Sequence, residues 1–306
     1  MKVLVLHATP PQAPGCGRVA DEFDLSNAAS NVASALPSAR VCGVRGEVRE
    51  VLALLDLYHP EVVFNLCEAP LGRPDLEAHV AAVLEWLGMR FTGCGSETLA
   101  LCRRKDLVNA VLRYAGVPVP RAVDPSRPVF PCIVKPASED GSAGLDHDSI
   151  CENPDALTRA VARLSGPVAI EAFLPGREFA VSLWGREGPD HVSIGETVFQ
   201  QGLRLITYAA KWHAESADFA NSPMVYDSEI ESALRDEILA TARGAWAAVG
   251  ARHFLRVDVR LDAAGSPKAL DVNPNPEMSP GVGICRAVQE AGWQWPDFVR
   301  NLVEWA

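Results

Sequence analysis

Several common signatures are missing from this chain of 306 residues, and each absence narrows the classes of protein to consider. No apolar run approaches the roughly 20 residues that span a bilayer, so no membrane partner is predicted. No Cys-x-x-Cys pair occurs among the 8 cysteines, which makes structural zinc or a disulfide framework a weak interpretation. Neither a Gly-x-Ser-x-Gly elbow nor a Walker loop is present, so the usual signatures of a serine hydrolase and a P-loop NTPase are both missing.

Positive charge is also scarce. The chain has 28 Lys and Arg against 39 Asp and Glu, for a net charge of −11. Such a balance argues against a nucleic-acid partner, although a nucleotide site needs only a few local cations. The apolar stretch at Met1–His7 is too short for a signal peptide, and unpatterned cysteines are typical of a reduced compartment. We therefore predict a cytoplasmic protein.

The first third of the chain alternates short apolar runs with helical patterns, which predicts a parallel sheet with helices on its faces. The expected strands are 3–6, 39–44 and 62–66, and the expected helices are 26–36, 48–58 and 76–87.

The remainder mixes strands and helices in a different order. The expected strands are 130–134, 168–173, 178–184, 254–261 and 268–272, and the expected helices are 105–114, 154–164, 229–249 and 298–305. Residues 195–226 are predicted to be long and irregular, and a loop of that length in a compact domain usually has a function.

The strongest pattern that points to chemistry lies in two late strands. A strand period of 2 puts Arg256, Asp258 and Arg260 on one face, and Asp271 and Asn273 on one face. If the strands close a hairpin, Asp258 lies opposite Asp271, and two opposed carboxylates need a positive partner. Mg²⁺ with phosphate oxygens suits this donor set. The alternative is a solvated hairpin with Arg–Asp salt bridges.

Two further segments carry candidate binding residues. Lys135 ends a buried strand just before the polar, glycine-containing loop 138–144, whose backbone N–H groups are suited to phosphate oxygens. Glu171 and Glu178 flank a tight strand–turn–strand, where one could take an adenine amino group and the other the ribose hydroxyls. The alternatives are a surface lysine and two rim carboxylates.

Taken in order, these motifs resemble the ATP-grasp superfamily and, within it, the D-alanine–D-alanine ligase family. The resemblance rests on Val63-Phe64-Asn65, Phe91-Thr92-Gly93, Lys105, Gly116–Pro120, Ile133–Pro136, Glu139–Ser142, Ile170-Glu171, Gly176–Glu178, Ala210–Trp212, Arg256–Asp258 and Asp271–Pro276.

The resemblance implies an α/β and α+β chain with the ATP-grasp fold, in which two subdomains clasp ATP. Residues 1–100 would form an N-terminal parallel α/β domain, residues 101–183 a small central subdomain, and residues 184–306 a C-terminal subdomain that carries the metal site. It also implies a homodimer as a candidate assembly.

The resemblance further implies a role for each matching residue. Nucleotide contacts would come from Lys105, Lys135, Ser142, Glu171, Ala172, Leu174 and Glu178. Lys211 would reach the γ-phosphate, and Arg256 would steady the tetrahedral intermediate. Asp258, Asp271 and Asn273 would hold two Mg²⁺ ions, with Mn²⁺ as an alternative. The implied reaction joins a small carboxylate or amino-acid substrate to an amine acceptor through an acyl phosphate, with release of ADP and phosphate.

The residues that read D-Ala in this family differ here. Residues 8–14 lack the expected carboxylate, Gly141 replaces a serine, Trp212 replaces a tyrosine and Glu277 replaces a glycine. We therefore expect an ATP-grasp ligase with another substrate pair. A true D-alanine–D-alanine ligase of cell-wall synthesis and an ATP-binding regulatory protein without turnover are the two alternatives.

Overall fold

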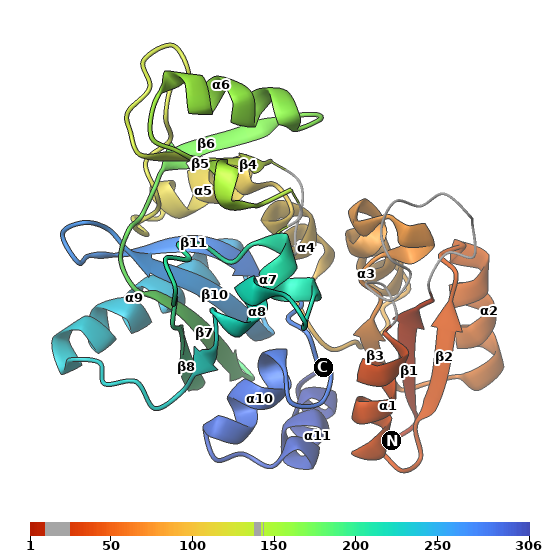
Figure 1. Ribbon diagram of the computed structural model, residues 1–306. Coiled ribbons are helices and arrows are strands. Elements are labelled where there is room, and N and C mark those ends of the chain that lie inside the picture. The colour runs from red at the N-terminus through yellow and green to blue at the C-terminus, as the bar shows by residue number, and fades with distance from the viewer. Residues whose placement is uncertain (10–24, 138–141, 143) are drawn as a thin grey trace.

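The first sheet begins with a strand that has no exposed side. The computed structural model describes residues 1–9, 25–137, 142 and 144–306. All six residues of β1 (Val3–Ala8) are buried, which fits the central strand of a parallel sheet covered on both faces. Its neighbours are β2 (Arg40–Val44) and β3 (Val62–Leu66), in the order β2-β1-β3. Three helices complete this N-terminal domain: α1 (Ser26–Ser34), α2 (Val48–Tyr58) and α3 (Glu77–Trp86) (Figure 1).

A small antiparallel sheet forms the central region. Its middle strand is β4 (Cys132–Pro136), flanked by β5 (Ile150–Cys151) and β6 (Val168–Ala172). The helix α6 (Pro154–Arg163) covers one face, and it begins cleanly because the Asn153 side chain accepts a hydrogen bond from the Ala156 N–H. The other face of β4 is left to the candidate site.

The largest sheet is antiparallel, in the order β11-β10-β7-β8-β9. Its strands are β7 (Glu178–Gly185), β8 (His191–Thr197), β9 (Met224–Val225), β10 (His253–Leu261) and β11 (Pro267–Asn273). Along β10, Leu255, Val257 and Val259 are fully buried in the core that also contains residues of α5 (Lys105–Tyr114) and α9 (Ser232–Val249). Strand alternation then turns Arg256, Asp258 and Arg260 to the opposite face.

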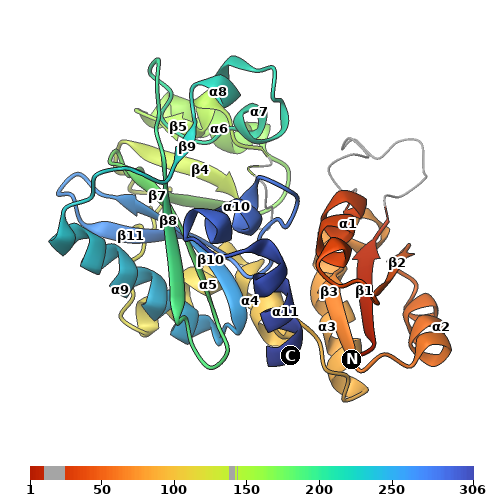
Figure 2. The ribbon, with the colours of Figure 1, turned by 90° about the horizontal axis from the view of Figure 1, so that it is seen from below.

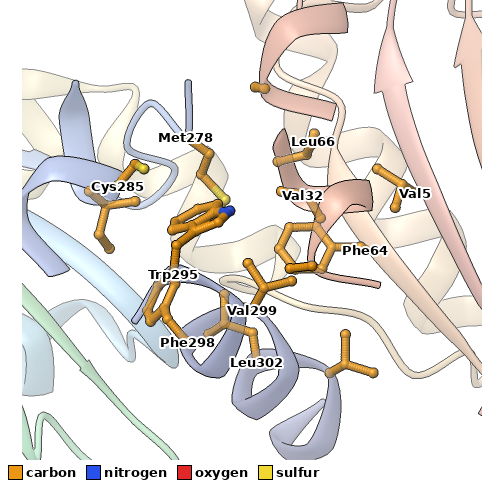
Figure 3. Close-up of a cluster of buried hydrophobic side chains, with 14 of the residues drawn as sticks. Val5, Val32, Phe64, Leu66, Met278, Cys285, Trp295, Phe298, Val299 and Leu302 are labelled. Atoms are coloured by element: carbon orange, nitrogen blue, oxygen red, sulfur yellow. The ribbon is translucent and has the colours of Figure 1, made fainter. Parts of the chain in front are cut away.

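The two ends of the chain are joined by one apolar cluster, shown in Figure 3. The N-terminal domain contributes residues such as Val32 and Phe64, and the helix α11 (Trp295–Trp305) contributes Phe298 and Val299. Because a shared buried core resists relative movement, this contact fixes the N-terminal domain against the C-terminal sheet.

Several elements differ from the sequence-based expectation. The segment predicted to be irregular contains the end of β8, the helices α7 (Tyr208–Trp212) and α8 (Ala217–Ala220), and β9 (Figure 2). The helices α4 (Ser96–Cys102) and α10 (Gly283–Glu290) were not predicted. They are short, and short helices depend on packing more than on local pattern.

The described residues form three sheets, and one boundary of the predicted three-region division does not follow their strands. The boundary between residues 183 and 184 falls inside β7, which pairs along its length with β10. A division drawn by sheets would therefore lie before Glu178. Among the described residues, no helix is long and apolar enough to cross a bilayer.

Candidate active site

The candidate site lies on the polar face of the large sheet, where the strand register sets side chains in rows. Asp258 of β10 lies opposite Asp271 of β11, and Arg256 lies opposite Asn273, as the sequence predicts. The register shifts just after Asp258, so a bulge separates this polar pair from the hairpin turn. Two carboxylates therefore share one edge of the site.

Two cations offset the repulsion between these carboxylates. The Arg256 guanidinium binds Asp258 through both oxygens, at 2.7 and 3.0 Å, and the Lys105 Nζ lies 3.1 Å from Asp271 Oδ1. Burial opposes the ionisation of Asp271 most strongly, but Lys105 and then Lys135 outweigh it and lower the pKa of that carboxyl below its ordinary value. Asp271 is therefore charged at neutral pH.

A second ion pair lies in the central region and is more deeply buried. The Lys135 Nζ is 2.5 Å from Glu171 Oε2, and Asn109 Nδ2 donates to Glu171 Oε1 at 2.7 Å. Residues 133 and 171 are register partners between β4 and β6, so the Glu171 side chain lies on the same face as Lys135. Lys135 and Asn109 therefore both bind the Glu171 carboxylate, the group for which the sequence predicts a contact with adenine.

The third ion pair joins Glu178 of β7 to Arg260 of β10. The distance between Arg260 Nη1 and Glu178 Oε2 is 2.9 Å, and both side chains are buried. Burial raises the pKa of Glu178, against the opposing effect of the Arg260 charge. The guanidinium also donates to the Arg204 carbonyl at 2.7 Å and lies 5.0 Å from the centre of the Phe173 ring. Arg260 was assigned no role from the sequence, although its position on the Asp258 face was the available signal.

One cavity brings most of the predicted residues together. Its polar and backbone lining includes these predicted residues: Lys105, Lys135, Ser142, Ala172, Leu174, Glu178, Asp258 and Asp271. Arg260 and apolar side chains form the rest of its wall, the apolar ones being Ile133, Pro136, Leu145, Phe173, Leu205, Ile206 and Leu270. Such a slot, lined by both apolar and charged side chains, suits a flat ring that carries an anionic chain.

Four predicted residues lie outside that lining. Arg256 and Asn273 occupy the next row of the sheet, one strand period beyond Asp258 and Asp271. Glu171 is turned to Lys135 and Asn109. Lys211 is exposed on α7, with its Nζ 5.8 Å from the centre of the Trp212 ring.

The segment that carries α7 and α8 is fixed to the central region by polar contacts. His147 Nε2 lies 3.1 Å from Asp218 of α8, and the Thr207 hydroxyl donates to the same carboxylate at 2.6 Å. The Tyr208 N–H donates to the Leu145 carbonyl at 3.0 Å. These contacts hold the segment beside the cavity, where Leu205 and Ile206 contribute to the wall.

The N-terminal domain reaches the same side of the molecule through Glu77. Its Oε1 accepts a hydrogen bond of 2.9 Å from Asn275 Nδ2, two residues after Asn273. Asn273 Oδ1 in turn accepts from the Asn275 N–H at 2.9 Å. Sequence reasoning missed Glu77, because no local pattern connects it with a loop almost 200 residues away.

The sequence of the C-terminal part of the chain matches a known family. The profile described as D-ala D-ala ligase C-terminus matches residues 122–304, which is more than half of the chain. The chain belongs to the D-alanine–D-alanine ligase family. It is therefore an ATP-dependent carboxylate–amine ligase, which forms a C–N bond.

Individual members of the family agree with this assignment. A D-alanine–D-alanine ligase of Rhizobium meliloti is 29% identical over 271 residues, which cover 84% of each chain. Solved structures of ligases are also similar to this chain. The Bacillus anthracis D-alanine–D-alanine ligase complexed with ATP has a TM-score of 0.73 at 17% identity, over 99% of this chain and 96% of that one. The VanG D-Ala:D-Ser ligase of Enterococcus faecalis has a TM-score of 0.75 at 17% identity, over 99% and 98%. These structures confirm the ATP-grasp fold.

Two of the family differences noted in the sequence fall partly or wholly outside the described residues. They are Gly141 and most of the segment 8–14. The other two are described. Trp212 ends α7 and is 39% exposed, and the Glu277 carboxylate accepts the Ser279 N–H at 2.7 Å.

Proposed function

We propose that this ligase transfers the γ-phosphate of ATP to a substrate carboxylate and then joins the resulting acyl phosphate to an amine other than D-Ala. The observation that carries the proposal is a cavity in which two lysines and three carboxylates, two of them opposed across the hairpin, line an apolar slot. The same observation favours turnover over the alternative of a regulatory protein without catalysis, because simple nucleotide binding does not need the opposed carboxylates.

In this proposal the nucleotide follows the polarity of the cavity. The adenine ring lies between apolar side chains such as Ile133 and Phe173, and backbone groups of residues 171, 172 and 174 meet its edge. Glu178, oriented by Arg260, takes the ribose hydroxyls. Lys105, Lys135 and the backbone at Ser142 take the phosphates. Lys211 reaches the γ-phosphate from α7, after turning from solvent toward the cavity.

The residues on the hairpin fit a hard divalent cation. Asp258, Asp271 and Asn273 offer two carboxylates and an amide oxygen, the donor type that Mg²⁺ prefers, and phosphate oxygens would complete its coordination. We propose that these three residues hold two Mg²⁺ ions, with Mn²⁺ as a substitute. When bound, the metal neutralises charge on the transferring phosphoryl group. Arg256 orients Asp258 through both of its oxygens, and Lys105 keeps Asp271 ionised and oriented for this purpose.

The bond changes then follow from the positions of the chain's own groups. An oxygen of the substrate carboxylate bonds to the γ-phosphorus, and the bond to the ADP oxygen breaks. The amine nitrogen next attacks the acyl carbon, the carbonyl oxygen becomes an oxyanion, and Arg256 stabilises that charge. Phosphate leaves with the bonding electrons, and the nitrogen loses a proton to leave an amide.

The second candidate is a true D-alanine–D-alanine ligase, which the names of the curated relatives favour. The residues of this chain favour another substrate pair. Trp212 donates a hydrogen bond but cannot accept one, and an α-ammonium without its carboxylate partner loses about 1.5–3 kcal/mol. We therefore expect D-Ala alone to be a poor substrate at both positions.

The test is release of ADP, screened over single and paired amino acids, with products identified by mass. Hydroxylamine in a parallel series intercepts any acyl phosphate as a hydroxamate. ADP and hydroxamate that both depend on the carboxylate substrate are expected. Abundant D-Ala–D-Ala from D-Ala alone would replace the leading proposal with the second candidate, and ATP-independent product would refute both.

A further inference from the structure

A group of side chains that the mechanism does not use lies beside the Asp258 and Arg256 rows, on the same face of the sheet. The strand registers place Gly195, Ala180, Asp258 and Asp271 side by side in one row across four strands. Ala180 and Gly195 are small, so they leave space above the sheet beside the carboxylate pair. The structure fills that space with an aromatic ring.

The ring belongs to Tyr226, which directly follows β9. A Cβ atom added at Gly195 would lie 2.7 Å from Met224 Sδ and 3.0 Å from the Tyr226 ring atoms Cε1 and Cζ, so these neighbours would have to shift. Glycine at this position of β8 therefore permits the ring to pack against the sheet. Tyr226 is thereby fixed on the same face as Arg256 and Asp258.

Arg286 of α10 meets the same ring from another element. Its Cζ lies 5.0 Å from the centre of the Tyr226 ring. Burial raises the pKa of Tyr226, and the charges of Arg286 and Arg256 act in the opposite direction. Arg286 also makes a long contact of 3.4 Å to Glu290 on the exposed side of its helix. An exposed ion pair of this kind contributes little to stability.

The rows of the sheet give these residues a place in the reaction. Glu178 and Arg260 form the row nearest the ribose in the proposed function, Asp258 and Asp271 form the phosphoryl row, and Arg256 belongs to the row after it. Successive rows are about 7 Å apart, because two residues of a strand separate them. The helix α10 packs on β7 and β8, and its residue Ile284 shares a core with Trp184 and Phe254, the register pair one strand period beyond Arg256. The acceptor amine must approach the acyl carbon from this side.

We propose that Tyr226 and Arg286 form the acceptor-binding wall of this ligase and hold the carboxylate of an amino-acid acceptor. The proposal rests on the function proposed above and adds to it the residues that select the second substrate. A neutral phenol O–H and a guanidinium fork, meeting from two elements, are donors that match a carboxylate. Acceptors without a carboxylate would leave these donors without an anionic partner.

The test compares two nucleophiles in the same reaction mixture. Hydroxylamine attacks the acyl phosphate without needing a carboxylate pocket. The acceptors are glycine and both enantiomers of alanine, serine and phenylalanine, each offered as free acid and as carboxamide. The wild-type enzyme is expected to use the free acid of its best acceptor at least about tenfold better than the carboxamide.

In Arg286→Gln, the ratio of peptide to hydroxamate should fall about ten- to hundredfold, and the preference for free acid over carboxamide should approach unity. Arg286→Lys should recover part of both, and Tyr226→Phe should show a smaller loss of the same kind. Arg300→Gln is the matched control, because Arg300 is an exposed arginine on α11 that pairs with Asp297.

Each other outcome counts against the proposal. A wild-type enzyme that uses carboxamides as well as free acids would overturn it. So would Arg286→Gln with an unchanged ratio, or with peptide and hydroxamate reduced equally, since that result indicates a structural role or a donor contact. A wild-type enzyme that forms no hydroxamate with ATP and any donor would overturn the proposed function, and this inference with it.

Discussion

The two sides of the candidate cleft hold their charges in different ways. On the central side, Lys135 and Glu171 are 8% and 5% exposed, and Asn109 completes the pair. On the hairpin side, Arg256 and Asp258 are 19% and 22% exposed, and Asp271 is 33% exposed. Removing one member of a buried pair leaves an uncompensated buried charge, which is costly. In a partly exposed pair, water or a ligand can replace the lost partner at a smaller cost in free energy.

This difference indicates a division of work. The buried pair sets the position of β4 against β6 and of α5 against both, so we expect it to matter for stability. The hairpin carboxylates are partly exposed, so we expect them to matter for ligand binding. Substitutions on the two sides should therefore separate loss of stability from loss of turnover.

The largest effect is expected from Glu171→Leu. This change leaves the Lys135 ammonium buried without its carboxylate, and we expect the free energy of unfolding to fall by about 3–5 kcal/mol in urea titrations. Adding Lys135→Met should recover most of the loss, because two apolar side chains replace the pair. Asp75→Leu, which breaks an exposed pair with Arg73, is the control and should leave the unfolding midpoint nearly unchanged. A loss in Glu171→Leu no larger than in that control would remove the contrast.

Asp271→Asn should produce the opposite pattern. One negative charge of the opposed pair is lost, so we expect ADP formation to fall at least about a hundredfold while the unfolding midpoint is retained. A titration with Mg²⁺ would show whether the metal requirement rises. Asp262→Asn, in the turn of the same hairpin and paired with Lys268, is the matched control. Turnover near the wild-type rate would refute the metal assignment.

His253 is a buried titratable group without an acidic partner in its contact with Gly93, and it extends the comparison to a side chain that is buried in its neutral form. Its Nδ1 accepts the Gly93 N–H at 3.1 Å, and burial lowers its pKa from 6.5 to about 4. The unfolded chain therefore binds a proton between those values that the folded chain does not, and stability falls as the pH decreases through this window. We expect a loss of about 2 kcal/mol between pH 6.5 and 5.

The control for that titration is His253→Asn. Asparagine tolerates the positive φ of 63° at this position but does not titrate. Urea unfolding at several pH values should show a flatter dependence in the variant. An unchanged slope would assign the acid sensitivity to other groups.

The smallest effect concerns the nucleotide. Backbone groups beside the apolar slot at Ala172 and Leu174 should prefer the adenine edge, so ATP should support turnover at least about tenfold better than GTP. The measurement is kcat/KM for each nucleotide at saturating amino acids. Equal values would move the adenine ring away from this slot.

Sequence patterns were most successful where neighbours in space are also related by a local period. The helices α2 and α5 have the predicted bounds, and β10 and β11 pair with Asp258 opposite Asp271 as expected. A short hairpin leaves few possible registers, so alternation of polar and apolar residues was sufficient. Local periods did not connect Lys105 and Lys135 with the acidic hairpin. Only the resemblance to a family placed these lysines in the same site.

Contacts between distant segments could not be derived in this way. Asn109 reaches Glu171 because α5 packs beside β6, and Glu77 reaches Asn275 because α3 faces the loop after β11. The local pattern of apolar and polar residues accounts for each of these segments on its own and therefore gives no sign of the contact between them. The sequence by itself therefore determined the strands, the main helices and the opposed carboxylates, since these depend on periods of two and 3.6 residues. Tertiary structure alone decided which cation meets each carboxylate and that Arg286 meets Tyr226, because those distances depend on how whole elements pack to bury their apolar faces.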